Sequence, residues 1–143
     1  MERHPQNVPQ AVERLKRRLA PETLDLMRGV PTSDDLWMLH LHVGTQIRNE
    51  LGLWAGNRRL ILDCGITRFD GLEADRASGM ILITLWHDLL ATATPSELAR
   101  SRADWRAAAG ADASDSLRSP RPTCAHAPDE SDANVHAAAV AIA

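Results

Sequence analysis

The chain has 143 residues, enough for one domain with a hydrophobic core and too few for two ordinary domains. Hydrophobic residues make up 44% of it, but alanine supplies a large share of that class, so we expect a small core. The net charge of −3 at pH 7 gives no overall electrostatic support for binding nucleic acid or an anionic membrane.

Two features of the sequence predict a soluble cytoplasmic protein with no membrane partner. The first ten residues, MERHPQNVPQ, lack the basic start and apolar run of a signal peptide. The longest apolar run, from Met80 to Trp86 apart from Thr84, is far too short to span a bilayer. Cys64 and Cys124 are the only cysteines, and in a reducing cytosol we expect two free thiols.

The first helix is predicted over residues 9–19, after an N-terminus of residues 1–7 that we expect to be flexible. Asn7 or the residue after it can cap this helix, and Pro9 is tolerated in its first turn. The basic run Lys16-Arg17-Arg18 falls in the last turn, where cations suit the helix dipole. This explains the run better than a nucleic-acid patch does.

A second short helix is predicted from Pro21, closed by Gly29 and Pro31. The central helix is predicted from residue 34 to about 51, with Thr32 to Asp35 supplying a cap and an acidic first turn. At about 100° per residue, its core-facing stripe is expected to contain Leu36, Leu39, Val43, Ile47, Leu51 and Trp54.

Glycines predict how the central helix ends. Gly52 and Gly56 indicate a tight turn, which we expect to pin Trp54 against the core. Asn57 is then expected to cap a short helix over residues 58–63.

A long helix is predicted over residues 72–90. The small residues Ala77, Ser78 and Gly79 would let a neighbouring helix approach closely, and we expect that neighbour to be the central helix. The main alternative is a strand over Ile81 to Ile83, because β-branched residues suit a strand.

The run Thr94-Pro95-Ser96-Glu97 predicts the start of a last helix that continues to about residue 109. Residues 110–143 are rich in Ala, Ser, Asp and Pro with few large apolar residues, so we expect a disordered tail. The elements together predict a mainly α-helical, single-domain bundle of about five to six helices over residues 8–109.

A row of unusual polar composition follows the central helix. His40, Gly44 and Arg48 recur at intervals of four, so they share one edge of the core stripe. An arginine fork and the Asn49 amide beside a histidine could clamp a carboxylate or phosphate, with His40 as acid or base. We favour the alternative that Arg48 forms a partly buried ion pair with Asp75, while His40 and Asn49 satisfy helix ends or loop carbonyls.

Other motifs predict no metal, cofactor or nucleophile. His40 and His42 point to different faces of a helix, and Cys64 has no neighbouring His or Lys to activate it. The turn from Gly52 to Asn57 lacks the Gly-Lys-Ser/Thr ending of a phosphate loop. No basic stripe interleaves the four tryptophans, which argues against base stacking. An exposed tryptophan would instead indicate a protein-binding groove.

The residues LH-x3-G-x2-IRN-x2-GLW-x-GN, from Leu39 to Asn57, resemble the signature of a bacterial family classed only as a domain of unknown function. In that family a segment like HFGLGMWIRNNWGLW is followed by a short helix, a loop, HPDD(M/A)SG and a second long helix. The resemblance covers about residues 8–92. It implies no activity, substrate or catalytic residue, and it assigns a turn and packing signature to Gly44, Gly52, Trp54, Gly56 and Asn57.

The chain departs from that family at two places. The family's His-Pro-Asp-Asp is Glu73-Ala74-Asp75-Arg76 here, and a glycine and a tryptophan of its first signature are His42 and Gln46. Any chemistry of the family that needs that histidine is therefore lost in this chain.

The sequence favours a small bacterial binding module whose partner is another protein, with no catalytic residue, metal or cofactor. The alternative is an enzyme that acts on a small anionic substrate through His40, Arg48 and Asp75. The identity of the partner and the oligomeric state stay open at this stage.

Overall fold

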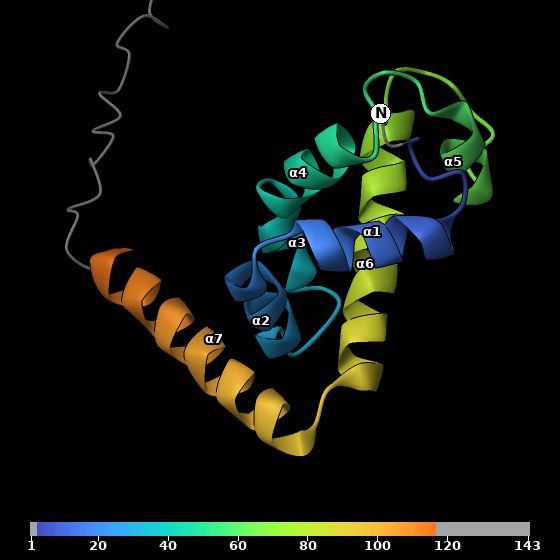
Figure 1. The fold of residues 1–143 in the computed structure, drawn as a ribbon. Coiled ribbons are helices and arrows are strands. Elements are labelled where there is room, and N and C mark those ends of the chain that lie inside the picture. The colour runs from blue at the N-terminus through green and yellow to red at the C-terminus, as the bar shows by residue number, and fades with distance from the viewer. Residues whose placement is uncertain (1–2, 117–143) are drawn as a thin grey trace, which may run out of the picture.

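The structure, a computed structural model, describes residues 3–116 of the chain, with side chains through residue 110. These residues form a small single domain of helices without a strand, so the predicted mainly α-helical fold is confirmed (Figure 1). The competing strand over residues 81–83 is wrong, because these residues lie inside a helix. The helices are α1 (Val8–Arg18), α2 (Pro21–Gly29), α3 (Leu36–His40), α4 (Val43–Glu50), α5 (Arg58–Asp63), α6 (Glu73–Thr92) and α7 (Pro95–Ser116).

Helix α6 runs through the centre of the domain, and α1, α2, α3, α4 and α5 all pack against it (Figure 1). Its sequence is apolar enough to bury a broad face, and the closest packing is with α4. Fully enclosed side chains from both helices form the middle of the core; they include Ile47, Leu51, Ile81 and Leu85. This pairing of the central segment with the long helix agrees with the close approach predicted for the small residues of α6. None of the described helices is both long and apolar enough to cross a membrane.

The predicted caps at both ends of the domain are present. The Asn7 carboxamide oxygen accepts a hydrogen bond from the Gln10 amide at 3.0 Å, and Pro9 lies in the first turn of α1. At the start of α7 the Thr94 amide donates to Glu97 Oε2 at 2.7 Å, and the Glu97 amide donates back to Thr94 Oγ1 at 3.3 Å. This reciprocal pair is a capping box, and it explains why α7 begins at Pro95.

The predicted central helix is wrong in one respect: it is two helices, α3 and α4, separated by Leu41 and His42. The Thr45 hydroxyl donates to the Leu41 carbonyl at 2.7 Å, and such bonding to the preceding turn competes with the helical ladder and bends helices. Before α3, the backbone N–H groups donate to carbonyl oxygens three residues earlier, as in 3₁₀ turns. The α-helix therefore begins at Leu36 and not at residue 34.

The predicted core stripe is correct up to the end of α4 and wrong at its last member. Leu36, Val43, Ile47 and Leu51 are buried and Leu39 is partly buried, whereas Trp54 is 59% exposed. Gly52 has φ +65°, so the chain leaves the helix at this residue. The change of direction takes Trp54 out of the stripe, and Leu53 is buried instead.

Helix α7 lies along α2, beyond the end of α6, and extends away from the rest of the domain (Figure 1). It continues to Ser116, past the predicted end at about 109, so residues 110–116 are helical and not disordered. The rest of the predicted tail, residues 117–143, lies outside the described residues.

Candidate functional site

The guanidinium group of Arg48 is the centre of a polar cluster between α4 and α6. Its Nη1 donates to Asp75 Oδ1 at 2.8 Å and to Ser78 Oγ at 3.0 Å, and its Nη2 donates to Thr45 Oγ1 at 3.0 Å. The Arg48 side chain is only 8% exposed, and its Nε is buried without a partner in the described chain. The structure therefore contains the ion pair that the sequence favoured, and this pair joins the two central helices.

His40 contacts the same cluster through Ser78. Its Nε2 lies 3.3 Å from Ser78 Oγ. The Ser78 hydroxyl also donates to the carbonyl oxygen of Asp75 at 2.9 Å and accepts from Arg48 Nη1. Ser78 Oγ therefore links His40 of α3 to the Arg48–Asp75 pair.

Gly44 makes room for this arrangement. A Cβ atom at this position would lie 3.1 Å from His40 Cδ2 and 3.3 Å from Arg48 Nη1. On α6, Gly79 leaves space for the same imidazole, since a Cβ there would lie 3.7 Å from His40 Nε2. The glycine between the histidine and the arginine is thus explained by packing of their side chains.

Asn49 does not join the cluster. It is exposed on α4, and among the described residues its side chain makes no hydrogen bond to His40, Arg48 or Asp75. The structure instead brings in Thr45 and Ser78, which the sequence analysis missed. Each lies one helical turn from an ionic partner, Thr45 three residues before Arg48 and Ser78 three residues after Asp75, and this spacing could have identified them.

Two exposed tryptophans lie at the ends of the row formed by His40, Gly44 and Arg48. The ring of Trp54 lies 5.0 Å from the Arg48 guanidinium carbon, so it covers the cation from the solvent side. The ring of Trp37, 68% exposed, stacks near His40 with 6.2 Å between the ring centroids. The row is therefore bordered by aromatic surface that faces solvent.

The turn from Gly52 to Asn57 holds the N-terminal segment against the domain. Asn57 Nδ2 donates to the Pro5 carbonyl at 2.8 Å and to the Leu51 carbonyl at 2.9 Å. Asn57 lies at the predicted N-cap position of α5, but its side chain makes no capping bond to that helix. Gly52 is also needed for contact with His4, since a Cβ there would lie 2.9 Å from the imidazole. Gly56 has φ +78° and meets nothing within 4 Å, so its role is conformational.

The structure gives little support to a metal site or to Cys64 as a nucleophile. Across the part of the chain that the structure describes, no group of three or more His, Cys, Asp or Glu is placed to hold a metal ion. Burial raises the pKa of the Cys64 thiol to about 11, and the neighbouring Asp63 carboxylate adds to the rise. Because the thiolate is the nucleophile, this environment makes Cys64 unreactive near neutral pH.

Alkylation of Cys64 is expected to be slow in the folded protein. A shift of the pKa from 9.0 to about 11 lowers the thiolate fraction at pH 8 by about 100-fold. In a Cys124→Ser variant, iodoacetamide should therefore modify the native chain about 100-fold more slowly than the same chain in urea. Equal rates in the two conditions would contradict the burial of this thiol.

Two hollows lie at the N-terminal segment and not at the polar cluster. One, of about 350 Å³, is formed with α1, and the other, of about 540 Å³, with the turn after α4. The sequence analysis missed both, because residues 3–6 were expected to be flexible. The signal available was the pair Arg14 and Arg17, three residues apart on one side of α1.

The comparisons with known proteins support the resemblance to a family of unknown function. Residues 4–89 match the family described as Domain of unknown function (DUF6794). No curated protein and no solved structure matches the chain. The matched residues include the polar cluster and the turn from Gly52 to Asn57, and they end within α6, before α7. Because the match covers more than half of the chain, the protein belongs to the DUF6794 family.

Proposed function

We propose that this protein is a small, non-enzymatic interaction module that binds a polypeptide segment of another protein through the exposed side of α3. The observation that carries the proposal is a group of three large side chains, each more than 60% exposed: Trp37, Met38 and Leu41. We call these side chains, two from α3 and one from the residue that follows it, the α3 apolar face. The cytoplasmic location expected from the sequence is part of the same proposal.

Helical spacing makes these side chains contiguous. Trp37 and Leu41 are four residues apart and Met38 and Leu41 three apart, so Leu41 adjoins both of the others. Small soluble domains seldom leave contiguous large apolar side chains in water, and such patches are typical of protein-binding sites. Tryptophan and methionine are also enriched at the centres of interfaces. The expected partner is an amphipathic helix, which meets such a face with its own apolar stripe.

The polar cluster beside this face supports a scaffold role better than catalysis. The Arg48 guanidinium already donates to Asp75, Ser78 and Thr45. Oδ1 of the Asp75 carboxylate is likewise bound by the arginine. The cluster instead fixes how α4 meets α6, and through His40 it supports the ring of Trp37.

Binding to the α3 apolar face is testable with a peptide library. A phage-displayed library of random peptides is selected on the immobilised full chain and counter-selected on a Trp37→Ala/Leu41→Ala variant. Peptides that survive are expected to bind the wild type and to bind the double variant at least about tenfold more weakly, since two central contacts are lost.

The matched control is Leu62→Ala, which removes an exposed apolar side chain from α5. It should leave the affinity of the selected peptides unchanged. Thermal unfolding of all three proteins checks that the exposed substitutions do not alter the fold. If no peptide is enriched, or if the peptides bind wild type and double variant equally, the α3 apolar face is not a binding surface.

A further inference from the structure

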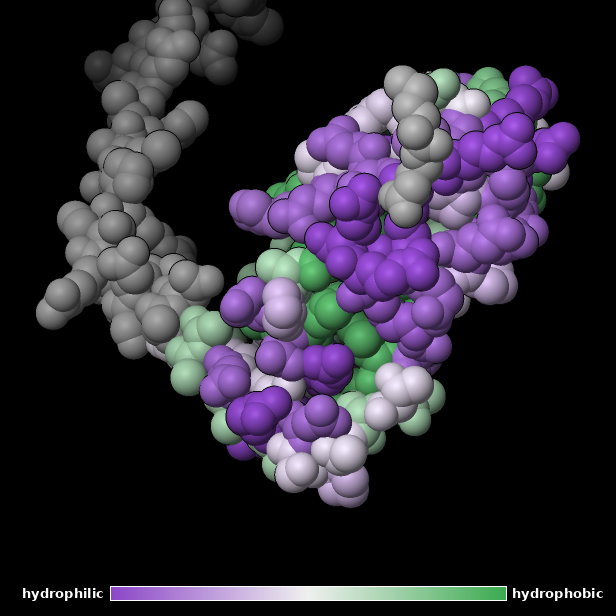
Figure 2. All heavy atoms as spheres, in the orientation of Figure 1, coloured by the Kyte–Doolittle hydropathy of each residue, from purple (hydrophilic) through white to green (hydrophobic). Residues whose placement is uncertain are grey.

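The long central helix α6 also carries exposed apolar side chains. Met80 and Ile83 are both exposed, and because they are three residues apart on a helix they adjoin each other. The side of the domain that α1 covers is different, since in Figure 2 the surface over α1 and the N-terminal end is strongly hydrophilic. The position of Ile83 relative to the α3 apolar face therefore decides how far that face extends.

Two polar contacts show the direction in which α3 passes α6. Arg48, in α4, bonds to Asp75 at 2.8 Å, and His40, at the end of α3, contacts Ser78 at 3.3 Å. Going back along the chain from Arg48 to His40 thus corresponds to going forward along α6 from Asp75 to Ser78. The segment formed by α3 and α4 therefore runs antiparallel to α6.

This direction places Trp37 beside Ile83. Trp37 is three residues before His40 and stacks near its imidazole, with 6.2 Å between the ring centroids. Ile83 is four residues after Gly79, and a Cβ atom on Gly79 would lie 3.7 Å from the same imidazole. Each side chain is thus about one helical turn from the contact of His40 with Gly79, in the same direction. We call the strip formed by Trp37, His40, Gly79 and Ile83 the seam surface.

A carboxylate lies at each end of the seam surface. Asp34 is exposed one turn before Trp37, whose amide donates to the Asp34 carbonyl at 3.4 Å. At the other end the Asp75 side chain is 46% exposed, although its Oδ1 accepts from Arg48. At 1.5 Å per residue, the helical path from residue 34 to residue 48 is about 20 Å long. The surface is therefore an apolar strip between two acidic ends.

We propose that the partner of the α3 apolar face is a cationic amphipathic helix that lies along the seam surface. Its apolar stripe would cover Trp37 and Ile83, and a Lys or Arg at each end of that stripe would meet Asp34 and Asp75. Charge complementarity favours cations at these ends, because a carboxylate placed opposite another carboxylate is repelled. Helix recognition through an apolar stripe is a common mode of peptide binding. This inference rests on the proposed function and names the chemistry of its partner.

A library of defined helices tests the charge of the partner. A helix of about 18 residues, about 27 Å long, is displayed on phage and selected on the immobilised full chain. One stripe of the helix varies among Leu, Ile, Phe and Trp, the positions that flank the stripe vary among Lys, Glu and Gln, and all other positions are Ala. Selected helices should carry Lys over Glu at both ends of the stripe at least about fivefold. Equal frequencies, or an excess of Glu, would overturn the proposal.

Removal of the two carboxylates is the second test. Asp34→Asn/Asp75→Asn should weaken binding of the selected helices about fivefold, because two exposed charge pairs are lost. Asparagine keeps an acceptor for Arg48, and thermal unfolding checks that the fold is intact. The control Glu22→Gln/Asp104→Asn removes the same charge at exposed positions of α2 and α7 and should bind as the wild type does. Equal binding by both double variants contradicts the assigned charges.

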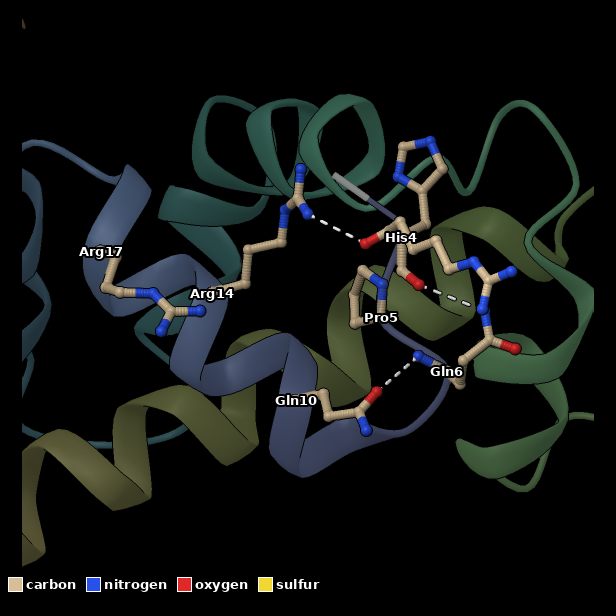
Figure 3. Close-up of a pocket in the computed structure, with 7 residues that line it drawn as sticks. His4, Pro5, Gln6, Gln10, Arg14 and Arg17 are labelled. Atoms are coloured by element: carbon tan, nitrogen blue, oxygen red, sulfur yellow. Dashed lines mark hydrogen bonds between the residues drawn. The ribbon is translucent and has the colours of Figure 1, made fainter. Parts of the chain in front are cut away.

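The position of the helix on α6 is tested separately. Ile83→Thr should weaken binding about fivefold, whereas the control Leu62→Thr, at an exposed position of α5, should not. In ¹⁵N NMR of the full chain, the Gly79 amide should shift when a selected helix binds. The Gln6 amide, which donates to Gln10 Oε1 at 3.0 Å in the N-terminal segment, should stay unchanged (Figure 3). The reverse pattern of shifts places the helix elsewhere and overturns the proposal.

The outcomes separate this proposal from the proposed function. Helices that are lost on Trp37→Ala/Leu41→Ala but tolerate Ile83→Thr and the double Asn variant leave the α3 apolar face as a binding surface and overturn the cationic helix on the seam surface. If no helix is selected, or if the selected helices bind the double Ala variant equally well, both proposals fail. Light scattering tests the competing occupant: a wild-type dimer that Ile83→Thr dissociates assigns the seam surface to a second copy of the chain and overturns the proposal.

Discussion

Replacement of Gly29 by alanine is expected to lower the free energy of unfolding by about 3 kcal/mol and to loosen α7 from α2. A Cβ atom at this position would lie 2.2 Å from the Ser101 carbonyl oxygen and 2.9 Å from Trp105 Cβ. The oxygen belongs to the backbone of a helix, so it cannot move aside as a flexible side chain would. Urea unfolding of wild type and variant measures the loss of stability.

The matched control for this experiment is Gly79→Ala. Gly79 is also a helical glycine in the domain, but the nearest atom to its added Cβ is His40 Nε2 at 3.7 Å, an ordinary contact distance. Because alanine favours helix by up to about 1 kcal/mol over glycine, this variant should be unchanged or slightly more stable. Equal stability changes in both variants would show that the contact with α7 carries no cost at Gly29.

Limited proteolysis reports separately on α7. Trypsin should cut after Arg100 and Arg102 sooner in Gly29→Ala than in Gly79→Ala, because the opened helix exposes its backbone to the protease. If the cleavage rates match, α7 stays docked and α2 adapts instead.

Gly29 also shows what local sequence patterns can and cannot predict. As a glycine followed by Pro31, it correctly indicated the end of α2. Its second role, allowing the α7 backbone to approach, depends on residues about seventy positions away, and no local pattern contains them. The same division explains the caps: Asn7 and Thr94 bond within one turn, so their neighbours in sequence were sufficient to predict them.

The tryptophans were harder to predict because their environment is tertiary. Extending the helical stripe of Leu51 by one more turn placed Trp54 in the core, but the left-handed conformation of Gly52 redirects the chain before Trp54 is reached. A helical periodicity predicts burial only for residues that still belong to the helix. Trp37 was not in the predicted core stripe, and it is 68% exposed on α3.

The candidate surfaces also differ in how far they could be predicted from the sequence. The spacing of His40, Gly44 and Arg48 placed them on one helix edge, and the ion pair with Asp75 followed from the pairing of two amphipathic helices. The two hollows at the N-terminal segment were not foreseen, because they form only where residues 3–6 pack against α1 and the turn after α4.

Arg48→Met is expected to lower the free energy of unfolding by about 2–3 kcal/mol. The substitution keeps most of the buried aliphatic volume but removes the donors to Asp75, Ser78 and Thr45. Loss of one member of a fully buried ion pair costs about 3–5 kcal/mol, and the value here should be smaller because the Asp75 side chain is 46% exposed and regains water. Chemical denaturation measures the change.

Asn49→Met is the control for that experiment, since Asn49 is the exposed neighbour of Arg48 on α4. Its stability should stay within about 0.5 kcal/mol of the wild type. Together with Trp37→Ala/Leu41→Ala, these variants separate scaffold from surface: Arg48→Met should lower stability, whereas the apolar-face variant should lower peptide binding and leave stability nearly unchanged. If Arg48→Met is as stable as Asn49→Met, the cluster does not hold α4 to α6, and its buried cation would need a ligand to explain it.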